Sequence, residues 1–207
     1  MELGTENDLT HFNLGAAYER NGNVDEAIRQ FEETIEINPR NAEAYNYLGY
    51  MYAEQGIKLD EALELVKRAL ELEPENGAFL DSLGWIYYQM GMTDQAVVAL
   101  ERAISIISDD PTGHDHLGDA YARRGDISQA IEKWKKALVL GSQDPEKIRQ
   151  KIEEAEVGNG ENEGGTGNSR DGQGRAGRSP GEQPSDLSDR SDLSDPSDQS
   201  DPTDPSD

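Results

Sequence analysis

A five-residue pattern, Leu-Gly-x-x-Tyr, occurs four times at a nearly constant interval, and this repetition constrains the fold more than any other feature of the sequence. Successive glycines of the pattern are 34, 35 and 34 residues apart. A period of this length is typical of repeat proteins, in which each unit buries its apolar face only by stacking on its neighbours. The chain is therefore predicted to form a stack of four similar units. The four glycines are Gly15, Gly49, Gly84 and Gly118.

Each unit is predicted to be a pair of helices. Its second half carries a small residue followed four positions later by a large apolar one, for example Ala27 and Phe31, or Ala130 and Trp134. Apolar residues at this spacing lie on one face of a helix. A glycine between the two halves suits the left-handed residue that commonly ends a helix. These glycines are Gly22, Gly56, Gly91 and Gly125.

Polar side chains and prolines indicate where the helices begin. Asp110-Pro111 and Asp144-Pro145 are interpreted as a capping residue followed by proline in the first helical turn. The second unit has one extra residue within Gly-Ile-Lys-Leu-Asp, which a surface turn can absorb. Side chains that can accept hydrogen bonds from free N–H groups are expected at the start of each second helix. They are Asp25, Asp60, Asp94 and Ser128.

The four units resemble the tetratricopeptide repeat, a 34-residue helix-turn-helix with a Trp-x2-Leu-Gly-x2-Tyr, Ala-x3-Phe, Pro signature. The resemblance implies an all-α fold, a right-handed α-solenoid of four helical hairpins whose first helices line a concave, peptide-binding groove. More narrowly, the last three repeats are similar to the C-terminal repeats of longer bacterial cell-envelope proteins of this family. The repeats are assigned to residues 8–41, 42–76, 77–110 and 111–144, after a short lead over 1–7. The signature's tryptophan position holds His11, Tyr45, Leu80 and His114.

After the fourth repeat the sequence divides into a predicted helix and a low-complexity segment. Over residues 145–157, Ile148, Ile152 and Ala155 share one face, so this segment is expected to cap the last repeat. Residues 158–207 are rich in Gly, Ser and Asp, and their only strongly apolar side chains are two leucines. So few apolar side chains cannot offset the entropy lost on ordering, and this acidic tail is predicted to be disordered.

Residues 113–126 hold two histidines and three aspartates, the pattern of a metal or catalytic site. Helical geometry places His114 and His116 about 200° apart around the axis, so the two rings cannot bind one ion from a single helix. A packing role is predicted for His114, while a weak metal contact at His116 is an alternative. The chain has no cysteine and only one further histidine. No catalytic, cofactor-binding or metal-binding residues are therefore expected.

The resemblance implies a peptide-binding groove on the first helices, next to the Leu-Gly core. Its aromatic and acidic side chains favour a protein or peptide ligand with basic and apolar side chains. Packing between neighbouring repeats is the alternative role for Tyr47 and Tyr88. The residues of the family's carboxylate clamp are absent, which disfavours an acidic C-terminal tail as ligand. The groove residues are Phe12, Asn13 and Ala16; Asn46, Tyr47 and Tyr50; Asp81, Ser82, Trp85 and Tyr88; and Asp115, His116 and Asp119.

Charge and hydropathy exclude several other classes of function. The formal net charge of −24 repels phosphate backbones and anionic lipids, so binding to nucleic acid is not expected. No apolar run is long enough to span a membrane, and the N-terminus lacks a signal-peptide pattern. A cytoplasmic location is expected; a truncated N-terminus would allow a periplasmic or cell-envelope location.

The sequence favours a non-catalytic scaffold for protein–protein interaction. An alternative is a structural fragment of a longer array, which self-associates through the first repeat because no cap precedes it. The third hypothesis is an enzyme or a metal-binding protein, and it has the least support from the residues of the sequence.

Overall fold

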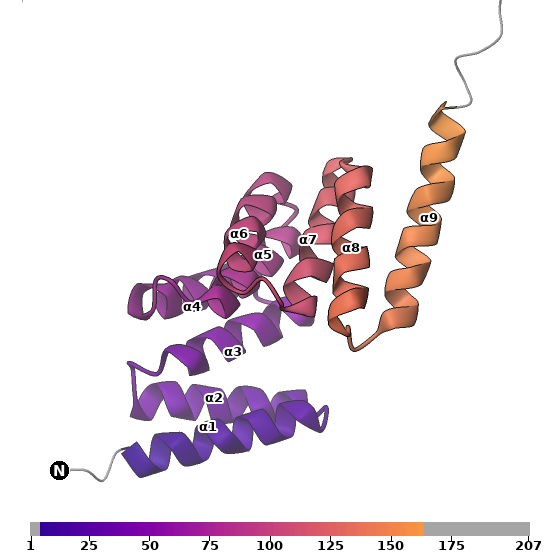
Figure 1. Cartoon of the computed structure of the whole chain (residues 1–207). Coiled ribbons are helices and arrows are strands. Elements are labelled where there is room, and N and C mark those ends of the chain that lie inside the picture. The colour runs from indigo at the N-terminus through magenta and orange to yellow at the C-terminus, as the bar shows by residue number, and fades with distance from the viewer. Residues whose placement is uncertain (1–4, 164–207) are drawn as a thin grey trace, which may run out of the picture. The chain divides into compact units, whose positions relative to one another are not determined.

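The computed structural model describes residues 5–163, and the side chains of residues 7–158. This part of the chain forms nine helices and no strand (Figure 1). All described residues belong to one compact unit. The predicted all-α class is thus confirmed. The helices are α1 (Thr5–Arg20), α2 (Val24–Ile37), α3 (Ala42–Glu54), α4 (Leu59–Leu72), α5 (Gly77–Gln89), α6 (Thr93–Ile106), α7 (Pro111–Arg124), α8 (Ile127–Leu140) and α9 (Pro145–Glu163).

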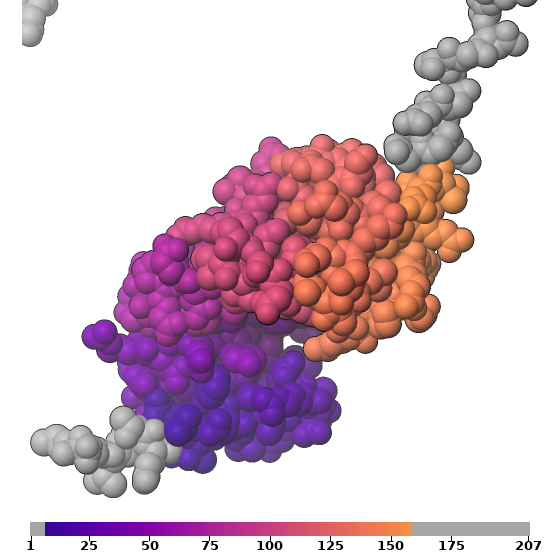
Figure 2. Space-filling model, in the orientation of Figure 1, coloured from indigo at the N-terminus to yellow at the C-terminus, as the bar shows by residue number. Residues whose placement is uncertain are grey.

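The first eight helices form four hairpins, which stack in chain order. In each hairpin an odd-numbered helix packs on the even-numbered helix that follows, and α2, α4 and α6 also pack on the first helix of the next hairpin. The first helices are neighbours too, since α3 contacts α5 and α5 contacts α7. Figure 2 shows successive hairpins in contact along the stack. The chain is therefore an α-solenoid of four hairpins, followed by α9.

Glycine brings the two helices of each hairpin close together. A Cβ atom at Gly84 would lie 2.5 Å from Cγ of Leu100, and one at Gly118 would overlap the indole ring of Trp134. These distances are far below van der Waals contact, so only glycine fits. The Leu-Gly pattern thus marks the contact points between helices. The equivalent contact glycines of the first two hairpins are Gly15 and Gly49.

The turn inside each hairpin contains a left-handed glycine, as predicted. Gly125, with φ of +94°, follows the last residue of α7 and donates its N–H to the Ala122 carbonyl. In the second repeat, the turn with the extra residue holds Lys58 at φ +48°, the one left-handed residue other than glycine within the described range. Its Nζ donates to the Tyr52 hydroxyl at 3.0 Å. The other turn glycines with positive φ are Gly22, Gly56 and Gly91.

Side-chain caps occur at the first helices of the hairpins and not at the second ones. The predicted caps of the second helices are wrong, because these residues lie one position inside the first turn of α2, α4, α6 and α8, and no side chain accepts a capping bond there. The three aspartates among them lie in the first turn of their helices, where their negative charge interacts favourably with the helix dipole. The misplaced residues are Asp25, Asp60, Asp94 and Ser128. The observed caps of α3, α5 and α7 are Asn41, Asn76 and Asp110.

Helix α9 covers the last hairpin, as predicted for residues 145–157. Ile148 and Ile152 are buried in a cluster that includes Trp134 of α8. The helix continues through Glu163, so residues 158–163 are helical, because a helix once formed extends at little cost per residue. This corrects the predicted start of the disordered segment. The rest of that segment, residues 164–207, lies outside the described residues.

At the opposite end, α1 has an uncovered face. Leu14 is 41% exposed, whereas the equivalent Leu48 and Leu117 are 3% and 0% exposed. In the later repeats the second helix of the preceding hairpin packs on the helix that carries this leucine. Helix α1 begins at Thr5, inside the predicted lead over residues 1–7. The described stack therefore ends on an apolar surface at α1 and on a capping helix at α9.

Candidate functional site

The predicted groove residues lie on the first helices of the hairpins, and the structure divides them by burial. Asp81, Ser82 and His116 are 8%, 4% and 7% exposed. They were predicted to face a ligand; the structure places all three among the buried side chains of the stack, and their contact with a ligand stays a prediction. Helices α5 and α7 approach closely where they meet, because a Cβ at Gly113 would lie only 3.4 Å from Oδ1 of Asp81. Side chains at this junction are enclosed between the two helices.

Asp81 and His116 form a buried pair that joins α5 to α7. Nδ1 of His116 lies 2.9 Å from Oδ2 of Asp81. Burial alone lowers the pKa of His116, but the carboxylates of Asp81, Asp115 and Asp119 together outweigh this effect, so that the pKa is raised above 6.5. The pair therefore links neighbouring repeats through a charge-assisted hydrogen bond when His116 is protonated.

Phe12 and Tyr47 fill the junction between the first two repeats. The Tyr47 ring stacks on Phe31 with centroids 5.1 Å apart, and its centroid lies 5.6 Å from that of Phe12. All three belong to one apolar cluster. For Tyr47, the packing role that the sequence left open is therefore the observed one. In the same repeats, Asn13 is exposed, Ala16 is buried, and Asn46 is half-buried with its Oδ1 unpaired among the described residues.

Three half-buried aromatic residues, Tyr50, Trp85 and Tyr88, form a row with His116 across α3, α5 and α7, here called the aromatic row. The Trp85 ring stacks on Tyr88 on one side and on His116 on the other, with centroids 4.9 and 4.3 Å apart. Tyr50 lies 6.4 Å from His116 between ring centroids. Within the described residues, Nε1 of Trp85 has no hydrogen-bond partner. The row is thus a mainly apolar surface, and the unpaired Nε1 of Trp85 is buried beneath it.

The C-terminal part of this surface is already neutralised by cations of the chain. Nζ of Lys151, on α9, lies 2.8 Å from Oδ1 of Asp115 and 2.7 Å from Oδ1 of Asp119. Nε1 of Trp134 also donates to Asp119, at 2.9 Å. Burial raises the pKa of the Asp119 carboxyl, although Lys151 opposes this effect. Asp115 and Asp119 were expected to receive a ligand's cation, and Lys151 takes that place.

Arg123 makes a similar contact with the aromatic row. Its guanidinium carbon lies 3.4 Å from the centroid of the Tyr88 ring, and Nη1 donates to the Tyr88 carbonyl oxygen. Sequence reasoning missed both Arg123 and Lys151. For Lys151 a signal was present, because it adjoins Ile152 on the apolar face of the predicted capping helix. Arg123 follows Tyr121 by two residues, and nothing in its spacing indicated an aromatic partner on α5.

Carboxylates without a cationic partner gather at the other end of the row. Burial raises the pKa of the Tyr50 hydroxyl, and the nearby carboxylates of Glu54, Asp81 and Glu19 raise it further. This end of the surface is therefore acidic, and Glu19 and Glu54 are both exposed to solvent.

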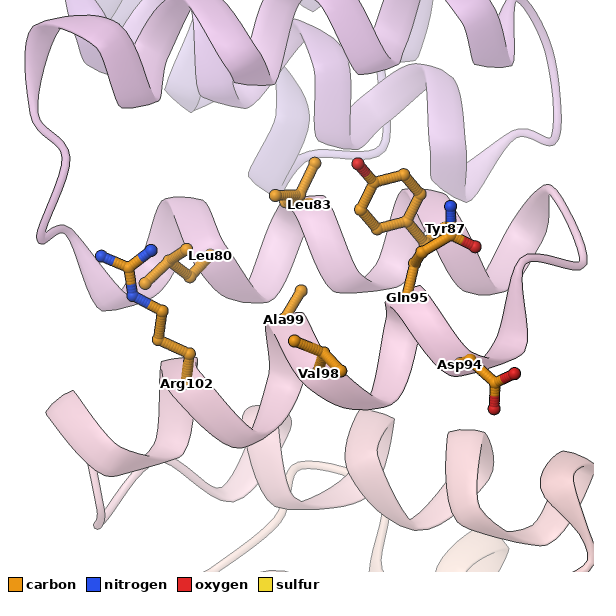
Figure 3. Close-up of a pocket in the computed structure, with 8 residues that line it drawn as sticks. All are labelled: Leu80, Leu83, Tyr87, Asp94, Gln95, Val98, Ala99 and Arg102. Carbon is orange, nitrogen blue, oxygen red and sulfur yellow. The ribbon is translucent and has the colours of Figure 1, made fainter. Parts of the chain in front are cut away.

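A hollow lies on the other side of α5, and no pattern in the sequence indicated it. A cavity of about 400 Å³ opens between α5 and α6 (Figure 3). Val98, on its rim, is 67% exposed, at a position where the other repeats have Arg29, Glu64 and Glu132. An adjacent hollow shares Leu80, Leu83 and Arg102 and extends to α4. The side chains that shape the cavity between α5 and α6 include Leu80, Leu83, Tyr87, Val98, Ala99 and Arg102.

His114 and His116 are both buried in the stack. His114 is 5% exposed and its Nε2 lies 3.1 Å from the Ser108 carbonyl oxygen, which confirms its packing role. Within residues that the structure describes, no group of three or more His, Asp or Glu side chains is placed to hold a metal ion. Nor does any described helix combine the length and apolarity needed to span a bilayer.

Comparison with known proteins identifies the repeat. Two family models match, one described as TPR repeat over residues 20–56 and one described as Tetratricopeptide repeat over residues 52–115. No curated protein sequence matches the chain. The solved structures, by contrast, include many similar folds.

A crystal structure of MamA protein is 25% identical in sequence, with a TM-score of 0.59 over 75% of this chain and 84% of that one. Residues 41 to the end of MamA from Desulfovibrio magneticus RS-1 give 22% identity and a TM-score of 0.60, over 76% and 88% of the two chains. PilF of Pseudomonas aeruginosa gives 20% identity and a TM-score of 0.66, over 77% and 72%. The last two likenesses concern the fold alone.

Proposed function

Because the chain is a tetratricopeptide repeat protein, we propose that it is a non-catalytic scaffold that binds a peptide segment of a partner protein along the aromatic row of α3, α5 and α7. Repeat stacks of this kind present extended surfaces suited to protein partners. The ligand is a segment with apolar side chains and at least one Lys or Arg.

The observation that carries this proposal is the row itself. Tyr50, Trp85 and Tyr88 are half-buried, and Trp85 and Tyr88 are held in place by stacking, so little of their side-chain entropy is lost when a ligand covers them. Tyr and Trp are also the side chains that most often dominate binding energy at protein interfaces. The surrounding acidic side chains and the net charge of −24 favour a basic ligand over an acidic one.

Tryptophan fluorescence offers a direct test, since the chain has two tryptophans. In a Trp134→Phe background only Trp85 reports. Titration with a synthetic library of peptides that combine Leu, Phe and Arg should change its emission, and Glu-for-Arg versions of the same peptides should not. Trp85→Ala should weaken the best binder by at least about tenfold, measured by anisotropy of the labelled peptide. Unchanged affinity in this variant would contradict the proposal.

Two controls separate lost binding from lost structure. Val98→Ser, on α6, alters the rim of the cavity between α5 and α6, which lies on the other side of α5 from the aromatic row. This variant should leave peptide affinity unchanged. Far-UV circular dichroism of Trp85→Ala should retain the helical signal. A variant that keeps its helices and loses the peptide supports the proposed surface.

Self-association is the second candidate function, and the uncovered face of α1 favours it. Leu9 and Leu14 are 56% and 41% exposed there. If a second copy covers this face, sedimentation should depend on concentration in the unmodified chain and not in Leu14→Glu. A monomer at all concentrations would exclude this function.

A further inference from the structure

The tyrosines at the two ends of the aromatic row differ in what lies against their rings. The guanidinium of Arg123 lies over Tyr88, with its carbon 3.4 Å from the ring centroid. No cationic side chain within the described residues lies over Tyr50 in the same way. The chain thus displays at Tyr88 the contact that a ligand's arginine would make, and leaves the Tyr50 ring without it.

The charges around the two rings differ in the same direction. Beyond Tyr88, Lys151 pairs with both Asp115 and Asp119, at 2.8 and 2.7 Å. Around Tyr50, neither Glu19 nor Glu54 forms a salt bridge with a described residue, although both act on the Tyr50 hydroxyl. A cation that approaches the row is therefore attracted to the Tyr50 end, where the carboxylates are not neutralised.

A buried carboxylate close to this end adds to its negative charge. Asp81 is 8% exposed, its Oδ2 is paired with His116, and its Oδ1 is buried as well, so it acts on a ligand through its charge and not by contact. Its charge acts on the Tyr50 hydroxyl as well. A guanidinium carries five N–H donors in a plane and stacks on aromatic rings, so it can contact a ring and several carboxylates together.

We propose that an arginine side chain of the partner binds on the Tyr50 ring between Glu19 and Glu54, while Arg123 occupies Tyr88 and closes the second position to ligands. This proposal rests on the proposed function and gives it a ligand chemistry and a location. The partner segment therefore needs one arginine at its Tyr50 end, and apolar side chains where it crosses Trp85. Removal of Arg123 opens a second arginine site on the same surface.

The probe that tests this site is N-acetyl-arginine amide, with the isosteric but uncharged citrulline amide as its control. Both are titrated into the full chain with ring-labelled tyrosine and followed by NMR. The arginine probe should shift the Tyr50 ring resonances and leave those of Tyr88 unchanged, and citrulline should shift neither. In Arg123→Ala, the arginine probe should shift both rings.

Matched variants identify the groups that hold the probe. Glu54→Gln should weaken binding of the arginine probe about fivefold, whereas Glu36→Gln, an exposed carboxylate on α2, should not change it. Tyr50→Phe keeps the ring and should retain most of the binding; Tyr50→Leu should lose it. Equal shifts with citrulline, or unchanged affinity in Glu54→Gln, would overturn the proposal.

The two proposals can fail separately. If library peptides bind at Trp85 with no requirement for arginine, the peptide-binding function stands and the arginine site is wrong. If the arginine probe binds at Tyr50 while no peptide of the library binds the row, the arginine site stands and the peptide-binding function is wrong.

Discussion

Four glycines determine how closely the helices of each hairpin approach one another. They were identified from the sequence because only a residue without a side chain would recur there beside Leu and Tyr. The structure adds which atoms fill the space, and these differ from one hairpin to the next. At Gly15 a Cβ would lie 3.0 Å from the Phe31 ring edge, whereas at Gly118 it would overlap the Trp134 ring. The same substitution should therefore cost different amounts in different repeats.

Gly118→Ala is expected to destabilise the chain by about 2 kcal/mol, because the added methyl group forces Trp134 away from a position fixed by its hydrogen bond to Asp119. Gly15→Ala should cost less, since its Cβ would lie 3.0 Å from the Phe31 ring, which needs to shift by only a few tenths of an ångström. Urea unfolding followed by circular dichroism measures both. Equal losses would show that the local fit does not decide the cost.

The buried pair of His116 and Asp81 makes stability depend on pH. The pKa of His116 is raised on folding, so its contribution is fully present below the ordinary value of 6.5 and is lost as pH rises through the folded value. Asp115 and Asp119 also raise this pKa. As pH rises from below 6.5 through the raised pKa of folded His116, the Tm of the unmodified chain should fall toward that of His116→Gln. A constant difference in Tm between the two proteins would mean that the ring does not titrate in this range.

Helix α9 makes a charged contact with the stack that the sequence did not indicate. Its apolar face was predicted from Ile148, Ile152 and Ala155, but its charged contact with α7 was not. Lys151 carries the largest share of that contact, because its side chain is only 18% exposed and both carboxylates facing it are less than a quarter exposed. Helix α9 is therefore joined to the stack by an apolar face and by one partly buried cation.

Lys151→Met should destabilise the chain by about 3 kcal/mol, because it leaves Asp115 and Asp119 close together without their cation. Lys135→Met is the matched control, because Lys135 also forms an ion pair with another helix, between α8 and α9. Its partner is Glu156, at 3.0 Å, and both side chains are more than half exposed, so the loss should be about 0.5 kcal/mol. Urea unfolding of the two variants measures the difference. Losses of similar size would contradict the structural role of Lys151.

The repeat pattern predicted the hairpins, their turns and the capping helix, since these follow from spacings within about forty residues. The surface was predicted only in part, because it depends on contacts between residues about 35 positions apart. Tyr50, Trp85 and Tyr88 come together on the first helices, and their contact with a ligand stays a prediction. His116 and Asp81 are aligned to the same face, yet they are buried where α5 meets α7, and this burial cannot be read from register. Arg123 and Lys151 were missed because their aromatic and acidic partners lie on other helices.

The whole stack should lose structure from its ends, because each hairpin is stabilised mainly by its neighbours. If the chain is cut after Gly141, α9 is removed, and with it the cover of Trp134 and the partner of Asp115 and Asp119. Hydrogen exchange measured by mass spectrometry should then become faster in α7 and α8 and remain unchanged in α3 and α4. A chain cut after Glu163, which keeps α9, is the control and should exchange as the full chain does over the shared residues. Faster exchange throughout the stack would show that the four hairpins unfold as one cooperative unit, so that loss of α9 would be transmitted to the aromatic row and to every repeat.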